Sequence, residues 1–289
     1  MIIGFIGLGK MGTPIALNLL EGGVDLRVYN RSKPKLEPLI LKGAKAVNQP
    51  KDLFNETNLV FSMLANDEAL IDVTLGDGGL LETIQPGGIH VSLSTVSPET
   101  IKKLAERHHE KKATLLTATV FGRPDAAEKK QLWVCLAGES QAKQIAEPYL
   151  KMIGQKIYDF GVHPETANMV KISGNFLILS VIEMLSEAFS VVKENGGRPE
   201  EFLALMTETI FPSPVFKNYG KIINQEEFIP AGFQMKLGLK DLSLFLGLAE
   251  KSGLDLSFAK ALRERLEKGI KNGLEDLDWS AISLFSQKP

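Results

Sequence analysis

The chain has 289 residues and a formal net charge of −2, enough for one large or two ordinary domains. The near balance of charge gives no sign of a nucleic-acid-binding surface, and the four histidines lack metal-ligand spacing. No uninterrupted apolar stretch is expected to be long enough to span a membrane. The single cysteine, Cys135, excludes an intrachain disulfide and favours a cytoplasmic location, with its thiol in the core. We expect His108 and His109 on the surface of a charged helix.

The first dozen residues carry a glycine pattern typical of nucleotide-binding turns. An apolar run at 2–6 leads into Gly7-x-Gly9-x-x-Gly12 and then into a segment with helical apolar spacing. Gly7 permits a tight turn, Gly9 lets the backbone approach a pyrophosphate, and Gly12 lets helix and strand pack closely. A purely structural turn is the alternative, but the strand before and the helix after favour a dinucleotide site. The residues predicted to bind the cofactor here are Gly7, Leu8, Gly9, Lys10, Met11 and Gly12.

The end of the second strand-like run, 26–30, indicates which dinucleotide binds. An acidic side chain there would accept hydrogen bonds from the ribose hydroxyls of NAD. This chain has Asn30, Arg31 and Ser32 instead, with Lys35 close behind. A guanidinium suits the 2′-phosphate of NADP, whereas the alternative is a solvated basic loop before a helix. We therefore predict NADP(H) in preference to NAD(H).

Strand-like and helix-like segments alternate in the first half of the chain, and only helical patterns follow Gly161. The apolar runs lie at 2–6, 26–29, 59–64, 89–93, 114–120 and 132–137, with an edge strand at 156–159. The later helical segments are 165–194, 200–208, 215–223, 235–252, 256–272 and 279–285. This order predicts an α/β protein, in which a Rossmann doubly wound parallel sheet (1–162) binds NADP and an all-helical domain (163–289) serves substrate binding and dimerisation.

The helix expected at 165–194 is apolar on more than one side, which exceeds a single amphipathic stripe. Such a surface favours burial against a partner as well as against its own domain, so we predict a homodimer or higher oligomer. The alternative is a buried central helix in a monomer.

One cation stands out in this apolar helix. Lys171 is the only Lys or Arg between His163 and Lys193, and Asn168 and Asn175 share its helical face. Burial lowers the pKa of a lysine, which suits a general acid or base near neutral pH. Two other interpretations remain open: this face meets water, or Lys171 pairs with an acidic group of the other domain.

Several segments together resemble the β-hydroxyacid dehydrogenases, the group of 3-hydroxyisobutyrate dehydrogenase, tartronate semialdehyde reductase and glyoxylate/succinic semialdehyde reductase. The resemblance covers essentially the whole chain, in order, and its most specific element is the pair Lys171 and Asn175 inside a long helix. The segments that carry it are 4–12, 63–67, 94–98, 168–175 and 233–242.

The resemblance implies roles for individual residues. Lys171 is expected to protonate the substrate carbonyl as hydride arrives from the nicotinamide, and Asn175 to hold the substrate beside it. Thr95 is expected near both the nicotinamide ribose and the substrate, and no metal is needed. The remaining expected cofactor contacts are Met63, Leu64 and Ala65, the last two on the adenosine side, with Lys240 and Phe233 from the helical domain.

The substrate loop departs from the family pattern. Where the family has a serine and two glycines, whose amides and hydroxyl grip a carboxylate, this chain has Phe121, Gly122 and Arg123. A phenyl ring cannot hydrogen-bond a carboxylate, so Phe121 favours a less polar or larger substrate. Arg123 either supplies a carboxylate fork or caps a nearby element.

The predicted activity is that of an NADP(H)-dependent oxidoreductase that interconverts a small aldehyde or keto acid and its alcohol or hydroxy acid. An imine reductase is one alternative, although those enzymes usually carry Asp or Tyr at the position of Lys171. A non-catalytic dinucleotide-binding sensor is an alternative of another class. The predicted partners are a small-molecule substrate and a second copy of the chain, with no nucleic acid and no membrane.

Overall fold

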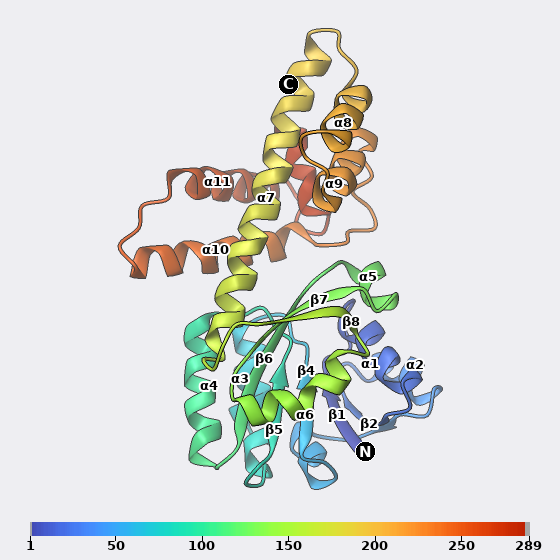
Figure 1. Ribbon diagram of the computed structural model, residues 1–289, viewed down its shortest axis with the longest axis vertical. Helices are drawn as coiled ribbons and strands as arrows, with labels where there is room; N and C mark the ends of the chain where they lie inside the picture. The colour runs from blue at the N-terminus through green and yellow to red at the C-terminus, as the bar shows by residue number, and fades with distance from the viewer. Residues whose placement is uncertain (1, 287–289) are drawn as a thin grey trace. The chain divides into compact units, whose positions relative to one another are not determined.

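The computed structural model describes residues 2–286, which form two compact units (Figure 1). The boundary between the units falls between Lys171 and Ile172. It therefore lies within the long helix α7 (Glu165–Glu194) and not before its first residue. The first two turns of this helix consequently belong to the first unit.

The first unit is built on one eight-stranded sheet in the order β3-β2-β1-β4-β5-β6-β7-β8. The expected strands are all present, with the last of them at the edge, and a two-residue strand is added at the opposite edge. The strands are β1 (Ile2–Ile6), β2 (Asp25–Tyr29), β3 (Lys45–Ala46), β4 (Leu59–Ser62), β5 (Ile89–Ser92), β6 (Thr114–Phe121), β7 (Leu132–Ala137) and β8 (Gly154–Asp159).

The last two strands, β7 and β8, depart from the parallel sheet that the sequence predicts, because both run opposite to β1–β6. β7 runs antiparallel to β6, with Phe121 opposite Trp133, while every other neighbouring pair is parallel. The connection spans only 122–131 and contains the short helix α5 (Pro124–Glu128). A parallel crossover needs about a dozen residues or more, so this connection can only return the chain as an antiparallel neighbour.

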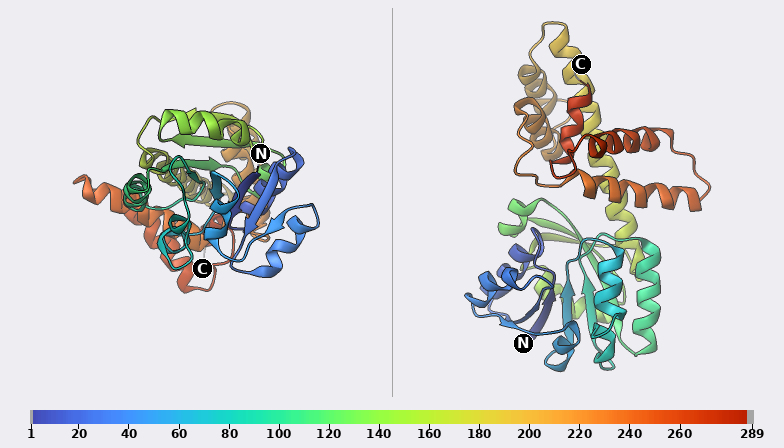
Figure 2. Two further views of the ribbon diagram at one scale, coloured as in Figure 1. Left: turned by 90° about the horizontal axis from the view of Figure 1, so that it is seen from below. Right: turned by 180° about the vertical axis from the view of Figure 1, so that it is seen from behind.

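Helices cover both faces of this sheet (Figures 1 and 2). Along β1, Ile3 and Phe5 join one core, whereas Ile6 joins another on the opposite face. Because both faces are covered, the central strands β4 and β5 are buried along their whole length, including their polar residues Ser62, His90 and Ser92. The first core takes in α1 (Gly12–Glu21), α2 (Glu37–Ile40), α5 and α6 (Ser140–Leu150); the opposite face carries η2 (Pro50–Asn55), η3 (Leu80–Glu82), α3 (Asp67–Leu75) and α4 (Pro98–Glu110).

The expectation that His108 lies on the surface is wrong, because it shares the inward face of α4 with Leu104. His90 and His108 are both fully buried, and their nearest ring nitrogens lie 3.3 Å apart. His108 Nδ1 lies 2.6 Å from the Leu104 carbonyl, and His90 Nε2 lies 2.8 Å from Ser62 Oγ. With Ser62 and His90 Nδ1 donating, every imidazole nitrogen is satisfied in the neutral form. His109 is exposed, as expected.

The second unit contains helices only within its described residues, 172–286. Its core packs side chains of every later helix around four α7 residues, Leu179, Ile182, Leu185 and Phe189, with α8 contributing only partly buried side chains. The expected helices are confirmed, and the last is a 3-10 helix. They are α8 (Pro199–Glu208), α9 (Pro214–Gln225), α10 (Met235–Lys251), α11 (Ser257–Lys271) and η4 (Trp279–Ser286).

Helix α7 has the predicted bounds, and it corrects the expectation that no apolar stretch of the chain is long enough to span a membrane. By length and composition it could cross a membrane, with a mean hydropathy of 1.6 over its most apolar window. The core helix of a soluble domain passes the same test, and 44% of that window is buried inside the protein. Three large apolar side chains spaced seven residues apart, Leu177, Met184 and Val191, remain exposed.

Candidate active site

The turn after β1 has the shape that its glycines predict. Gly7 has φ +94°, and a side chain there would collide with the Met63 carbonyl. A Cβ on Gly12 would collide with the carbonyl of Gly7, whereas a Cβ on Gly9 would meet no atom within 4 Å. Two of the glycines are therefore required by packing, and the third leaves open space beside the backbone.

The start of α1 suits an anion. No side chain caps its first turn, and none of its first-turn residues is acidic. Its amides and the positive end of its dipole can therefore receive a phosphate. The turn is also tied to β2, because Leu8 N donates to Asn30 Oδ1 at 2.9 Å. These features fit the pyrophosphate of a dinucleotide.

The basic segment after β2 lies at the same edge of the sheet. Besides accepting from Leu8, Asn30 donates from Nδ2 to the Ser32 carbonyl at 2.8 Å, which shapes this loop. The side chains of Arg31, Ser32 and Lys35 are exposed, the last on the short helix η1 (Lys33–Leu36). A 2′-phosphate beside Asn30 would meet cationic side chains and no carboxylate from residues 30–36.

The segments after β4 and β5 are joined to each other and to β1. Met63 N donates to the Ile6 carbonyl at 2.8 Å, and Leu64 N donates to Ser94 Oγ at 2.8 Å. This places 63–65 beside 94–95, at the carboxyl ends of adjacent strands. The chain order reverses between β1 and β4, and ligands of open α/β sheets bind at such a switch point.

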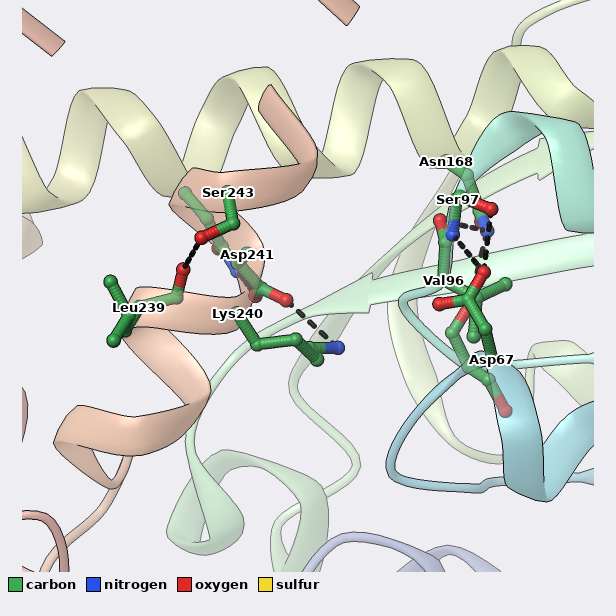
Figure 3. Close-up of polar contacts among 10 residues, drawn as sticks. Asp67, Val96, Ser97, Asn168, Leu239, Lys240, Asp241 and Ser243 are labelled. Carbon is green, nitrogen blue, oxygen red and sulfur yellow. Dashed lines mark hydrogen bonds and ion pairs between the residues drawn. The ribbon is translucent and has the colours of Figure 1, made fainter. Parts of the chain in front are cut away.

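Hydrogen bonds to β6 and to the segment after β5 fix the start of α7. Thr117 Oγ1 donates to the Pro164 carbonyl, and Thr119 Oγ1 donates to Ala167 O at 3.0 Å. Asn168 is fully buried, and its Nδ2 donates to Val96 O at 3.1 Å (Figure 3). These bonds hold the helix turn that carries Lys171 over the carboxyl end of β6.

The ammonium of Lys171 lies on an aromatic ring. Lys171 Nζ is 4.1 Å from the centroid of Phe121, the last residue of β6, within range of a cation–π interaction. The next residue, Gly122, has φ +142°, and any side chain there would strike Leu132. Arg123 stands at the N-cap of α5, but its side chain makes no capping hydrogen bond. The sequence predicts both Lys171 and Phe121 in the site but not their contact.

In the second unit the predicted residues Asn175 and Lys240 both contact Asp241, an acidic residue to which the sequence assigns no role. Asn175 Nδ2 donates to Asp241 Oδ2. Lys240 Nζ lies 2.9 Å from Asp241 Oδ1, an ion pair without hydrogen-bond alignment (Figure 3). Asp241 is 2% exposed. The sequence feature that could have pointed to Asp241 is its position directly after Lys240 in the segment that resembles the family.

Phe233 also lies in the second unit, with its ring centroid 4.7 Å from that of Trp279 in an edge-on contact. Its amide donates to the buried carboxylate of Asp278. The segment before α10 is thereby fixed. Among residues 2–286, no group of three or more His, Cys, Asp or Glu side chains could hold a metal ion.

Two family profiles cover nearly the whole chain. The NAD binding domain of 6-phosphogluconate dehydrogenase matches residues 2–161, and the NAD-binding domain of NADP-dependent 3-hydroxyisobutyrate dehydrogenase matches 166–285. The chain belongs to the β-hydroxyacid dehydrogenase family. It is therefore a pyridine-nucleotide-binding oxidoreductase, a dehydrogenase acting on CH–OH groups.

Individual family members agree with this assignment. The chain is 45% identical to the uncharacterised oxidoreductase YfjR of Bacillus subtilis, over 98% of both chains. It is 31% identical to the chloroplastic glyoxylate/succinic semialdehyde reductase 2 of Arabidopsis thaliana, over 97% of this chain and 78% of that one. The fold matches the crystal structure of 3-hydroxyisobutyrate dehydrogenase from Salmonella typhimurium with a TM-score of 0.88, 20% identity and 99% coverage of both.

Proposed function

We propose that this dehydrogenase uses NADP(H) to interconvert a small aldehyde or keto acid and its alcohol or hydroxy acid, with Lys171 as general acid and base. When bound, the nicotinamide supplies or accepts the hydride. Lys171 donates a proton from Nζ to the carbonyl oxygen during reduction and removes it during oxidation. Asn175, one helical turn later, binds the substrate, and Thr95 lies beside the ribose.

The observation that carries this proposal is the anchoring of Lys171. Three side chains, Thr117, Thr119 and Asn168, hydrogen-bond across the junction between the sheet and α7. They hold a lysine at the carboxyl edge of the sheet, the same edge as the glycine turn. A proton donor that is fixed in advance costs less entropy at the transition state.

The preference for NADP(H) rests on the loop after β2. Arg31 and Lys35 are exposed, and neither forms an ion pair with another described residue, so both are available to a 2′-phosphate. The Asn30 side chain is already committed to Leu8 and Ser32. Residues 30–36 contain no carboxylate that could bind the ribose hydroxyls of NAD.

Phe121 favours a second candidate, an imine substrate. The ring removes the hydroxyl that would hold a carboxylate and leaves an apolar wall beside Lys171. A substrate without a carboxylate at this point, whether an apolar aldehyde or a cyclic imine, loses no hydrogen bond when the ring stands in place of the serine. A carboxylate-bearing substrate would rely on Arg123.

We also propose that the chain forms a homodimer or higher oligomer in the cytoplasm, without binding nucleic acid or membrane. The exposed apolar row Leu177, Met184 and Val191 supports an interface along α7. The buried Cys135 is compatible with a reducing compartment.

NADPH oxidation over a panel of aldehydes, 2-oxo acids and cyclic imines tests the activity. Lys171→Met keeps most of the side-chain length without the ammonium, and we expect it to lower kcat at least a hundredfold while NADPH still binds. Lys193→Met, an exposed lysine on the same helix, is the matched control. Undiminished turnover in Lys171→Met contradicts the acid–base role. NADPH binding without turnover of any carbonyl or imine favours the sensor.

A further inference from the structure

The strand β6 meets the start of α7 through three residues at every second position, which therefore lie on one face of the strand. Thr117, Thr119 and Phe121 contact Pro164, Ala167 and Lys171 in turn. Side chains two residues apart on a strand repeat every 6.5–7 Å, and a helical turn rises about 5.4 Å, so successive strand residues meet successive turns. Phe121 occupies the third position of this series.

The three contacts differ in what they hold. The two threonine hydroxyls bind backbone carbonyls and therefore fix the helix itself. The Phe121 ring instead lies 4.1 Å from the Lys171 ammonium and so acts on the tip of the side chain. An aromatic face stabilises a cation within about 6 Å, and unlike a carboxylate it cannot take the proton away.

We propose that Phe121 is a positioning residue for Lys171: its ring holds the protonated ammonium at the end of β6. This role rests on the proposed function, because it assigns Lys171 as the proton donor. It gives the loop residue that departs from the family pattern a part in the chemistry, beyond making the loop less polar. The ring stabilises the charged acid and limits its side-chain rotamers.

The Cys135 thiol on the neighbouring strand β7 is a titratable group within electrostatic range of the same ammonium. Burial raises the pKa of the Cys135 thiol on β7, and the positive charge of Lys171 opposes that rise. The thiol is packed in a small cluster with Ala137 and Ala167, against which Phe121 also lies. A Cys135→Ala background removes its titration from the measurement.

Competitive acetylation of Lys171 across pH, followed by mass spectrometry, reads the protonated state without substrate or cofactor. Lys193 serves as an internal reference. In Phe121→Leu, which keeps an apolar side chain without the ring, we expect the acetylation midpoint of Lys171 to fall by about half to one pH unit. Phe121→Tyr keeps the ring and should restore the wild-type midpoint.

The sign of the shift separates this role from simple packing. Loosened packing alone would hydrate the ammonium, which favours the charged form and moves the midpoint upward. An unchanged or raised midpoint in Phe121→Leu, or no restoration in Phe121→Tyr, overturns the proposal. Circular dichroism checks that each variant is folded, and Phe121→Met is a second ring-free variant.

Activity provides the second readout. The basic limb of the kcat/KM profile should move to lower pH in Phe121→Leu by the same amount as the acetylation midpoint. If Lys171→Met keeps full turnover, the proposed function fails. The acetylation midpoint then still shows whether the Phe121 ring stabilises the Lys171 ammonium. If the limb stays in place while the acetylation midpoint falls, the positioning role in catalysis is overturned.

Discussion

Asn175 donates a hydrogen bond to Asp241, and the same buried carboxylate lies 2.9 Å from the ammonium of Lys240. Asn175 comes from α7 and the other two residues from α10, so a single carboxylate joins the side chains of two helices in the second unit. Both of its partners are residues that the family resemblance places near substrate or cofactor. The carboxylate therefore restricts the orientation of both side chains within the second unit.

Replacing Asp241 by Ala should weaken the fold and the activity together. The buried Asn175 amide would lose its acceptor, which costs about 1–3 kcal/mol of unfolding free energy. Urea unfolding measures this loss, and kcat/KM should fall because the Asn175 amide is no longer held. Asp241→Asn keeps an acceptor oxygen and should recover most of the stability. Equal stability of Asp241→Ala and the wild type would show that the hydrogen bond contributes nothing.

Replacing Arg31 by Ala should weaken NADPH far more than NADH. A charge-assisted contact with a phosphate is worth about 1.5–3 kcal/mol, so the dissociation constant for NADPH should rise roughly 10- to 100-fold. Fluorescence titration with each cofactor measures the two constants. Lys42→Ala, another exposed cation, is the control. Equal losses for both cofactors would contradict the phosphate contact.

The buried pair His90 and His108 predicts acid sensitivity. Burial lowers the pKa of His108 to about 4, and burial together with a charge on His108 lowers the pKa of His90 well below 6.5. Unfolded histidines gain protons below about pH 6.5 while the folded pair stays neutral. The stabilisation is therefore complete above pH 6.5 and is lost as the pH falls toward 4, by about 3 kcal/mol for His108.

Unfolding free energies at pH 7, 6, 5 and 4.5 test this prediction. Because the carboxylates are common to both proteins, the difference between wild type and His108→Gln isolates the histidine. The variant should lose stability less steeply with falling pH, by up to about 1.4 kcal/mol per pH unit. His109→Gln, at the exposed neighbouring position, should keep the wild-type slope. Parallel curves for wild type and His108→Gln would refute the assignment.

The exposed row on α7 predicts assembly. Leu177 is 62% exposed and Met184 is 49% exposed. A charge placed in an apolar interface is strongly unfavourable, so Leu177→Glu combined with Met184→Glu should shift the protein toward monomer in light scattering. Leu41→Glu, at an exposed leucine of the first unit, should leave the mass unchanged. A monomeric wild type would dismiss the interface.

Local patterns predicted most of the fold. The helix at 165–194 was predicted to the residue, because Pro164 precedes it and paired glycines follow it. The reversal of β7 was missed because an apolar run carries no direction, and only the length of its connection determines it. His108 was wrongly predicted to be exposed because its sequence neighbours are charged. The helical spacing of four residues, which puts it on the same face of α4 as the buried Leu104, is the better guide.

The site was harder to predict than the fold. The sequence named Lys171 and Phe121 separately, because fifty residues part them and their contact depends on how β6 meets α7. Asp241 was left without a role for a similar reason. Its importance comes from Asn175, which lies on another helix and becomes its neighbour only in the folded second unit. Spacing along a chain cannot report such contacts.

The antiparallel return of β7 also affects how this enzyme can diversify. Because β6 and β7 are antiparallel neighbours, the loop 122–131 starts and ends at the same edge of the sheet. Insertions or deletions between these two anchors need not disturb the register of any strand. The loop that includes Gly122 and Arg123, which we propose contacts the substrate, can therefore change in length and sequence through evolution or engineering while the nucleotide-binding scaffold is inherited intact.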